Sequence, residues 1–517
     1  MRLAFNGASW KRVDFLVHRW TAIILGLLVF SWFLSGIALM YYPWPAVTES
    51  RELAHLEPLD LPSADTAIIG FADAASRTLQ RTDAIHLARF GGRLVYQIRR
   101  DDGHGPEPVE FLDAADGRRL TPISDGDARV LASAYAPAES GPLGVDRLVR
   151  GDRYLMSREY ARFFPAYRVR FDDAAGTAVY VSRDRGSVFA TVTSRTRATT
   201  WLGVVPHWLY FQWLYRSSRL WTWLNLLLPA FAAIIAMTGI AFGVTRLFPR
   251  RRQHIWRLSE YRGVSNWHHV AGVLFGVIVL TWTVSGVLEM LGGDDAPRPG
   301  DGARARGSVA WDSVRVTPAR AIAAATGFAR APAADVVALD LVQLDGRPGY
   351  DVRLRDRREV WVDAGTGAVR GDMPEADAVA TARRVMYGPL ARGGPGDSVR
   401  VTHAERIDRY DTYYYARSGR ERHLPAWRVA FDDPARSVVY LNSVSGAPVG
   451  FVDAGVRRWR WWRDAAHSLD FPAINNHRPL WDAIVLPLML GGVVLSGTGM
   501  WLVVRRLKRT VTVSRSE

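Results

Sequence analysis

The chain contains no cysteine among its 517 residues. This absence excludes disulfide bonds, iron–sulfur clusters, thiolate metal sites and the covalent attachment of a c-type haem. It does not by itself choose a cellular compartment.

Lysine is nearly missing as well, because Lys11 and Lys508 are the only two, so arginine supplies almost all of the positive charge behind the net +15. A basic chain can bind nucleic acid, but no nucleic-acid-binding motif accompanies this charge. We therefore predict no nucleic-acid partner and assign the arginines to solvated surface and to membrane-flanking segments. A Gly-x-Gly-x-x-Gly sequence after a strand is also lacking, so no nucleotide or flavin site is predicted.

What the chain does have is four long apolar runs that carry almost no charge. A helix rises about 1.5 Å per residue, so about 20 apolar residues cross the hydrocarbon of a bilayer. The first run is too long for a secretory signal peptide, and the aromatic and proline residues Tyr41–Pro45 follow it instead of a small-residue cleavage site. We predict transmembrane helices at residues 15–42, 220–246, 266–291 and 481–504.

Short basic segments flank these runs at residues 1–14, 247–264 and 505–517. By the positive-inside rule all three are cytoplasmic, so the two long stretches between the spans face the other side. In a Gram-negative cell this arrangement predicts a multi-pass inner-membrane protein in contact with lipid, with large periplasmic domains. Two aromatic stretches are predicted to lie at the membrane interface: residues 201–216 as an interfacial helix and residues 457–471 as an interfacial segment.

The long stretches, residues 59–195 and 309–452, have the pattern of water-soluble domains. Ala64–Gln80 and Asp125–Tyr135 show helical spacing, and short strand-like runs such as Ile85–Phe90 follow, with turn residues between them. The fold class predicted is therefore an α-helical membrane protein with α+β extramembrane domains, each built from small helix-plus-antiparallel-sheet units in tandem.

The sequence also repeats itself, which predicts an internally duplicated protein. The motif Pro165-Ala166-Tyr167-Arg168-Val169 recurs as Pro425-Ala426-Trp427-Arg428-Val429. The same duplication pairs residues around the apolar runs: His18 with His268, Ser35-Gly36 with Ser285-Gly286, His207 with His467, and Thr238-Gly239 with Thr498-Gly499. The later pairs keep one constant offset, which chance matches would not do.

Four histidines stand out because the repeat pairs them. His18 and His268 lie at the cytoplasmic ends of the first and third spans, and His207 and His467 lie ahead of the second and fourth. Helices related by a pseudo-twofold axis would bring the members of each pair together. Facing neutral imidazoles among Trp, Phe and Leu suit bis-histidine ligation of haem b iron. The alternative for any single histidine is an ordinary interfacial polar residue.

Two further alternatives concern the same region. His269 is adjacent to His268 and is a possible ligand in its place, but the repeat favours His268 because His269 aligns with Arg19. An all-protein metal site is a weaker alternative, since no carboxylate shows ligand spacing with the four histidines. Glu289, near the outer end of the third span, is either a proton acceptor in quinol oxidation or a carboxylate that reaches the interface.

The remaining histidines carry less weight. We expect the five that lie in the soluble stretches to be surface residues: His55, His86, His104, His403 and His423.

These motifs together resemble a known family. A histidine opens a span that closes with Ser/Thr-Gly, a soluble insert contains an Asp-Ala-x-x-Gly turn (Asp113–Gly117 and Asp363–Gly367), and a second histidine precedes a span with Thr-Gly. Because these motifs occur in this order and in two copies, the chain resembles the PepSY-associated transmembrane proteins. That family includes iron-regulated inner-membrane proteins and ferric-siderophore reductases. The resemblance covers nearly the whole chain.

The resemblance implies four spans, periplasmic PepSY domains and haem b held by the span-associated histidines: His18, His268, His207 and His467. Because the histidines form two pairs, we expect two haem groups. One departure concerns the outer site. Family members typically have a Leu-His-Thr-Gly-like sequence at the second histidine, whereas this chain has Pro206-His207-Trp208 and Ala466-His467-Ser468.

The predicted function is a haem b reductase that passes electrons across the membrane to a periplasmic acceptor, with an Fe(III)-siderophore as the best candidate. Because no nucleotide or flavin motif is visible, the donor must be separate, either quinol or a cytoplasmic reductase. The alternative is a non-enzymatic PepSY membrane protein that binds a peptide, a protease or a transporter partner, with structural histidines.

Overall fold

The computed structural model describes residues 7–514 with gaps at 43–46, 48, 62–69, 77–83, 91, 100–108, 121–122, 153, 156–157, 162, 248–258, 260, 292–308, 345, 388–398, 417–420 and 476. Most of the predicted loop 247–264 and of the predicted helix Ala64–Gln80 lies outside the described residues. The chain divides into two compact units. We call them the helical unit (Met1–Trp44, Thr196–Asp294 and Arg458–Glu517) and the sheet unit (Pro45–Arg195 and Asp295–Arg457).

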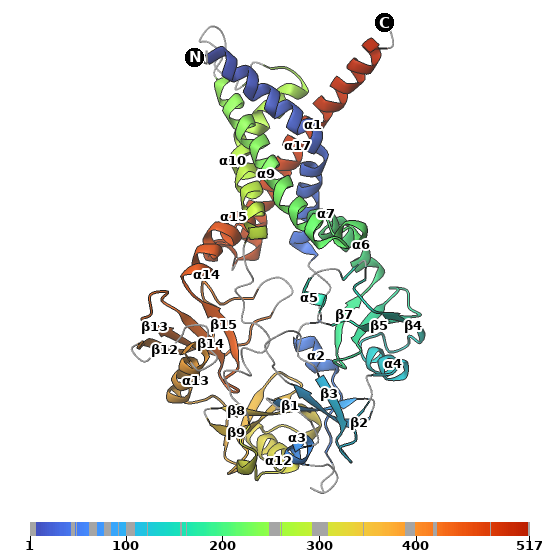
Figure 1. The fold of residues 1–517 in the computed structure, drawn as a ribbon, viewed down its shortest axis with the longest axis vertical. Coiled ribbons are helices and arrows are strands. Elements are labelled where there is room, and N and C mark those ends of the chain that lie inside the picture. Colours follow the sequence, from blue (N-terminus) through green and yellow to red (C-terminus); the bar gives the residue numbers. More distant parts are fainter. Residues whose placement is uncertain are drawn as a thin grey trace. The chain divides into compact units, whose positions relative to one another are not determined.

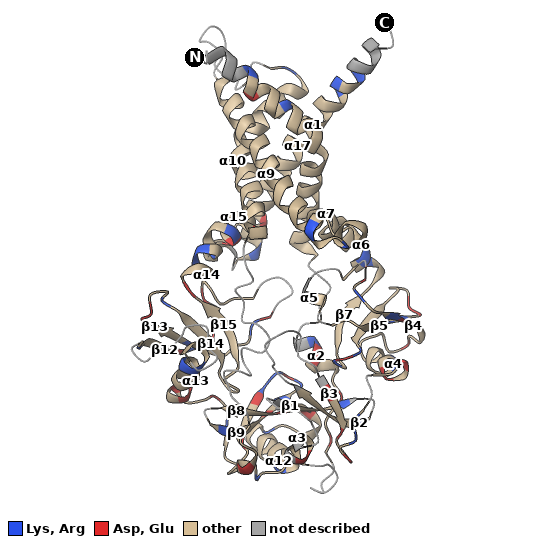
Figure 2. Cartoon of the chain, viewed as in Figure 1, with Lys and Arg blue, Asp and Glu red and all other residues tan. Residues whose placement is uncertain are grey.

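The helical unit is built on four long helices, α1 (Gly7–Tyr41), α9 (Ser218–Thr245), α10 (Val264–Leu291) and α17 (Arg478–Ser514). Each contains a stretch long and apolar enough to cross a membrane, with a mean hydropathy between 1.8 and 2.4. Helix α10 packs against both α9 and α17, and α1 packs against the same two helices (Figure 1). Among the described residues of the bundle, charged side chains gather toward the helix ends, and the middle carries none (Figure 2). These helices agree with the four predicted spans.

Short helices precede α9 and α17. The first group is α6 (Ser194–Leu202), α7 (Val204–His207) and α8 (Gln212–Tyr215). The second group is α14 (Ala454–Trp459), the π-helical turn η3 (Arg460–Ala465), α15 (Ala466–Ser468) and α16 (Pro472–Asn475).

The predicted interfacial stretch 201–216 is thus broken into pieces and not one helix. The chain turns at Leu209 and again at Leu469, whose φ angles of 53° and 49° lie in the left-handed region that an α-helix does not use. Each turn lies two residues after one of the paired histidines, His207 or His467. They send the chain back towards the bundle.

The sheet unit contains three antiparallel sheets. The largest has seven strands in the order β11-β10-β9-β8-β1-β2-β3. Its strands are β1 (Ala84–Phe90), β2 (Arg93–Arg99), β3 (Val109–Asp113), β8 (Val336–Leu344), β9 (Arg347–Leu354), β10 (Glu359–Asp363) and β11 (Val369–Arg370).

Two four-stranded sheets complete this unit. The first contains β4 (Pro142–Leu148), β5 (Ala166–Phe171), β6 (Ala178–Ser182) and β7 (Val188–Val192). The second contains β12 (Val401–Ile407), β13 (Ala426–Phe431), β14 (Val438–Asn442) and β15 (Pro448–Val452). Their strand-to-strand registers correspond closely: Ala166 pairs with Ser182 in the first sheet, and Ala426 pairs with Asn442 in the second.

The remaining helices of the sheet unit cover the sheets or connect them. They are α2 (Glu49–His55), α3 (Phe71–Ser76), α4 (Asp125–Ser133), α5 (Arg158–Ala161), η1 (Trp311–Ser313), α12 (Pro318–Ala329), η2 (Ala333–Asp335) and α13 (Glu375–Tyr387).

Helices α4 and α12 begin where their sequences predict. Ser124 and Asp127 cap each other's main-chain groups at the start of α4, which is a capping box. Thr317 accepts a hydrogen bond from Arg320 N, and Pro318 occupies the first turn of α12, where its missing N–H costs nothing.

The sequence did not predict that the two soluble stretches share one sheet. Strand β1 from the first stretch pairs antiparallel with β8 from the second, and His86 lies opposite Asp340. Strand β8 is buried along its whole length. A strand covered on both faces needs neighbours on both edges, and β1 supplies the second one.

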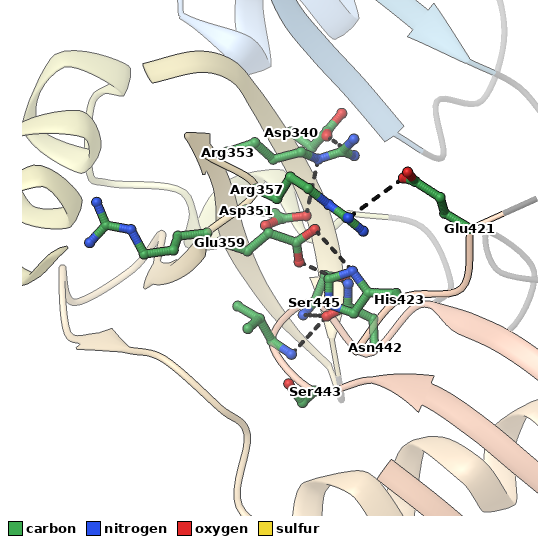
Figure 3. Close-up of polar contacts among 12 residues, drawn as sticks. Asp340, Asp351, Arg353, Arg357, Glu359, Glu421, His423, Asn442, Ser443 and Ser445 are labelled. Atoms are coloured by element: carbon green, nitrogen blue, oxygen red, sulfur yellow. Dashed lines mark hydrogen bonds and ion pairs between the residues drawn. The ribbon is translucent and has the colours of Figure 1, made fainter. Parts of the chain in front are cut away.

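A polar contact cluster joins β10 to the second four-stranded sheet (Figure 3). Glu359 accepts a hydrogen bond from Asn442 Nδ2 at 2.8 Å, and its other oxygen lies 4.0 Å from His423 Nδ1. Arg357 lies 3.6 Å from Glu421 at the edge of the same cluster. His423, expected at the surface, is therefore largely enclosed.

Candidate functional site

The first candidate pair of ligands is His18 of α1 and His268 of α10. Their ring centroids lie 6.3 Å apart, with the ring planes tilted by 47°. His18 Nδ1 lies 3.0 Å from the carbonyl oxygen of Ile235, and His268 Nδ1 lies 3.1 Å from that of Leu495. A carbonyl oxygen only accepts, so each Nδ1 carries the proton and Nε2 keeps its lone pair.

The second pair is His207 of α7 and His467 of α15, whose ring centroids are 6.2 Å apart. Ser35 Oγ lies 3.1 Å from His207 Nδ1, and Ser285 Oγ lies 3.0 Å from His467 Nδ1. Each serine hydroxyl donates its own hydrogen to a main-chain oxygen one turn earlier, at 3.1 Å in both cases. The hydroxyl therefore accepts from Nδ1–H, and Nε2 again keeps its lone pair.

Tryptophans of the following spans hold the chain next to both outer histidines. Trp221 Nε1 donates to the carbonyl oxygen of Trp208 at 2.9 Å, and Trp481 Nε1 donates to that of Ser468 at the same distance. Each accepting residue comes directly after a histidine in the sequence. Helices α9 and α17 thus fix the position of the segment that carries each ring.

Glycines give the histidine rings room against the neighbouring helices. A Cβ atom at Gly239 would lie 2.8 Å from His18 Cε1, and one at Gly499 would lie 3.0 Å from His268 Cε1. Such contacts are shorter than side chains tolerate without displacement. The Thr-Gly sequences found in α9 and α17 therefore admit a ring at close range.

The electrostatic state of His207 suits a metal ligand. Burial, and secondarily the neighbouring His467 ring, lower the pKa of His207 to about 3. The ring is thus neutral near pH 7, and neutral imidazole is the form that binds metals.

An apolar cluster shares the bundle with the two pairs. It includes Phe33, Val279, Trp282, Val485 and Met489, and the rings of Phe33 and Trp282 lie 5.8 Å apart. Seventeen residues separate His268 from Ser285 along α10, which corresponds to about 26 Å of helix rise. The pairs therefore lie near opposite ends of the bundle.

Each pair offers two imidazoles whose Nδ1 atoms are engaged, so each would present two Nε2 nitrogens as ligands. Two imidazole nitrogens are a donor set that a haem iron can take, and the four histidines are the residues that would hold it. No cluster of three or more His, Cys, Asp or Glu side chains suited to a metal ion occurs among the described residues.

His269, the alternative to His268, points elsewhere. Its Nε2 lies 2.9 Å from the carbonyl oxygen of Gly243, and its ring meets Tyr261 edge-on at 5.4 Å. The structure thus brings together the four histidines that the repeat paired, and it leaves His269 outside the inner pair. Haem ligation by the four stays a prediction.

Glu289, singled out in the sequence, lies at the outer end of α10. Its carboxylate is 3.3 Å from Arg463 Nε, and Arg463 also contacts Asp464 at 2.9 Å. An ion pair close to His467 thus accounts for this acid. Arg460 and Asp470 form a second, buried ion pair in the same segment, at 3.1 Å. Neither ion pair was predicted from the sequence, because the partners of each pair are separated in the chain.

Besides His423, a second soluble-stretch histidine is not at the surface, contrary to expectation. His86 is 9% exposed and lies on β1 in the middle of the seven-stranded sheet, where Asp340 is its partner at 2.8 Å. His403 on β12 is exposed, as expected. His104 lies outside the described residues.

One part of the chain matches a known protein family. Residues 315–373 match the family model described as "PepSY: Peptidase propeptide and YPEB domain". In the structure these residues run from just before α12 through β8, β9, β10 and β11. No curated protein matches the chain. The protein thus contains a PepSY domain together with four candidate membrane-spanning helices and sheet-rich α+β regions.

Proposed function

We propose that this protein is an electron carrier of the bacterial inner membrane that holds two haem b groups. His18 and His268 would ligate the inner haem, and His207 and His467 the outer one. The observation that carries the proposal is the spacing of the two ring pairs, 6.3 and 6.2 Å, with every Nδ1 engaged by a hydrogen bond. This is the arrangement that leaves Nε2 for iron.

When bound, a bis-histidine haem supplies reversible one-electron transfer at its iron. The protein's part is orientation and exclusion of water. Ser35 and Ser285 fix the tautomer of the outer rings, and main-chain carbonyls do the same for the inner rings. The apolar cluster around Trp282 keeps the space between the two ends of the bundle dry.

Internal duplication accounts for the paired contacts, and we include it in the proposal. The Ser–His contact of the outer pair occurs twice, as does the contact of a histidine with a Thr-Gly segment in the inner pair. Duplicated halves related by a pseudo-twofold axis would supply one ligand each to both sites. Under the positive-inside rule the basic ends of the spans are cytoplasmic and the sheet unit is periplasmic.

The substrates follow from the proposed direction of transfer. Quinol or a cytoplasmic reductase would donate electrons, and a periplasmic Fe(III)-siderophore would accept them. Reduction to Fe(II) weakens a hard-oxygen chelate and releases the iron. Each one-electron step at iron is balanced by oxidation of the donor, with two steps for each quinol.

The direct test uses the purified full chain in proteoliposomes, with a quinol in the membrane and ferric siderophores outside together with a ferrous-iron trap. The proposal predicts Fe(II) formation that depends on quinol and is lost in His207→Ala. Ferric-chelate reduction at the same rate in that variant, or none with any donor, would contradict it.

The second candidate function is a non-enzymatic PepSY membrane protein that binds a peptide, a protease or a transporter partner. The match at residues 315–373 favours it. Haem content separates the two candidates, because this alternative predicts colourless protein even when haem is plentiful during expression.

A further inference from the structure

The sheet unit contains a cavity of about 370 Å³ that the membrane histidines do not involve. One wall is the seven-stranded sheet, represented by His86, Ala88 and Gln97, and the opposite wall includes α2 and α4. Its volume lies at the lower end of the range of small-molecule sites, about 300–1,000 Å³.

The corresponding space beside the second four-stranded sheet is filled. There Val342, Leu344 and Trp361 of the large sheet pack with Met373 and Val444 into one continuous apolar cluster. Beside the first four-stranded sheet, in contrast, the core of the large sheet and the core under α4 form two separate clusters. The cavity lies between them, so it is a specific feature of this side.

A row of polar side chains crosses the wall of the cavity. His86 lies opposite Gln97 on β2 and opposite Asp340 on β8, so the three side chains share one face of the sheet. His86 Nδ1 donates to Asp340 Oδ1 at 2.8 Å. Arg353 donates to the other oxygen of Asp340 at 2.5 Å (Figure 3). The carboxylate of Asp340 thereby holds a proton of His86 on Nδ1, which leaves Nε2 as the acceptor nitrogen of this cavity-lining ring.

Three polar groups of the residues on this wall lack a hydrogen-bond partner in the part of the chain that the structure describes. One is Arg353 Nε, which is itself buried. The others are His86 Nε2 and the carboxamide of Gln97, in residues that are 9% and 5% exposed. Buried polar groups in native proteins are almost always hydrogen-bonded. An acceptor and a donor–acceptor group therefore lie side by side on the sheet wall of the cavity.

The charged residues of the lining are committed to the protein itself. Arg89 donates to main-chain oxygens of Leu59, Asp60 and Gly92, and Glu57 accepts from Gly92 N at 2.9 Å. Arg353 is engaged by Asp340. These contacts leave His86 Nε2 and the Gln97 carboxamide on the sheet as the polar recognition surface. Leu53, Val130 and Leu131 supply apolar surface opposite.

From this arrangement we infer that the cavity is a binding site for a small neutral amide, such as a short peptide segment with small apolar side chains. An amide N–H donates to His86 Nε2, and an amide carbonyl accepts from the Gln97 carboxamide. Residues 315–373, the matched PepSY domain, supply Asp340 and Arg353, which orient His86. The site is wholly within the sheet unit, so it does not rest on haem binding.

The test is calorimetric titration of the full chain in detergent with N-acetyl-alanyl-alaninamide. We expect saturable binding at millimolar concentrations or below. Gln97→Leu and His86→Leu should weaken it at least tenfold, since each leaves an amide group of the probe without a partner. Succinate and ethylammonium, charged probes of similar or smaller size, should not bind.

Two further variants keep the test decisive. His403→Leu alters an exposed histidine on β12 and should bind the probe as the unaltered chain does. Ala88→Leu fills the cavity and should abolish binding, while its thermal unfolding followed by circular dichroism should stay cooperative. This variant keeps the inference testable even if His86→Leu fails to fold. Absence of binding to the unaltered chain, binding that survives Ala88→Leu, or preference for a charged probe would overturn the inference.

Discussion

Arg460 and Asp470 form a buried ion pair around the segment that carries His467. Arg460 Nη1 lies 3.1 Å from Asp470 Oδ2, and each side chain is 5% exposed. The pair links the π-helical turn before His467 to the chain just after the left-handed Leu469. It therefore closes the loop that presents the histidine to the bundle.

Asp470→Ala should destabilise the protein strongly, because it leaves a buried guanidinium without its counter-charge. Breaking one side of a buried ion pair costs about 3–5 kcal/mol, a factor of about 10² to 10³ or more in the folding equilibrium. Asp482→Ala is the matched control. Asp482 pairs with Arg478 at 3.0 Å on α17, but these side chains are 27% and 49% exposed. An exposed pair of this spacing contributes about 0.3–0.5 kcal/mol.

The assay is unfolding in increasing SDS, followed by tryptophan fluorescence, together with haem content by the pyridine haemochrome method. Asp470→Ala should lower the SDS midpoint far more than Asp482→Ala does and should reduce haem content through loss of the outer site. If both variants behave alike, the ion pair does not position His467 and the reasoning fails.

Three further predictions concern the histidine pairs. Gly239→Ala should displace the His18 ring, whose Cε1 would lie 2.8 Å from the new methyl group, and should therefore lower inner-haem occupancy. Gly26→Ala should leave that occupancy unchanged, because no atom outside its own stretch of helix would lie within 4 Å of the new methyl group. Ser285→Ala should weaken haem binding at the outer site about 10- to 100-fold, the usual effect of removing the partner of a ligating histidine, as measured by haem titration of the haem-free protein. In that haem-free protein the unfolding free energy should fall as the pH drops below about 6.5, by at most about 1.4 kcal/mol per pH unit. The reason is that His207 binds a proton below about pH 6.5 in the unfolded chain, whereas in the folded protein it stays neutral down to about pH 3.

Each of these predictions has a control or an outcome that contradicts it. Full inner-haem occupancy in Gly239→Ala would show that the ring has other room. Thr281→Ala removes an exposed hydroxyl that bonds within its own helix, and it should leave haem affinity unchanged. For the pH dependence, His207→Gln should flatten the slope. An equally steep slope in that variant would assign it to other groups.

The spans and the histidine pairing were accessible from sequence because both rest on local or repeated patterns. Hydropathy identifies a membrane helix from its own residues, and the repeat identified His18 with His268 before any contact was known. The first helix is longer than the predicted span, because α1 begins at Gly7 and the span was predicted from residue 15. Its basic first turns continue the helix outside the apolar run.

The arrangement of the sheet unit was not accessible in this way. His86 was expected at the surface because it lies in a soluble stretch. The face of β1 that carries it instead lines a cavity whose other walls include α2 and α4, and β8 pairs with the edge of the strand. None of these three elements is adjacent to β1 in the sequence. The break in segment 201–216 was missed for a similar reason, because the left-handed residue there is leucine and not glycine.

The measurement that tests the central claim most directly is the haem b content of the purified chain and of two double variants. We predict two haems per chain in the unaltered protein, with a reduced-minus-oxidised spectrum of b type. We predict one haem in His18→Ala/His268→Ala and one in His207→Ala/His467→Ala. Protein that stays colourless after expression with ample haem, or haem content unchanged in either double variant, would contradict the account.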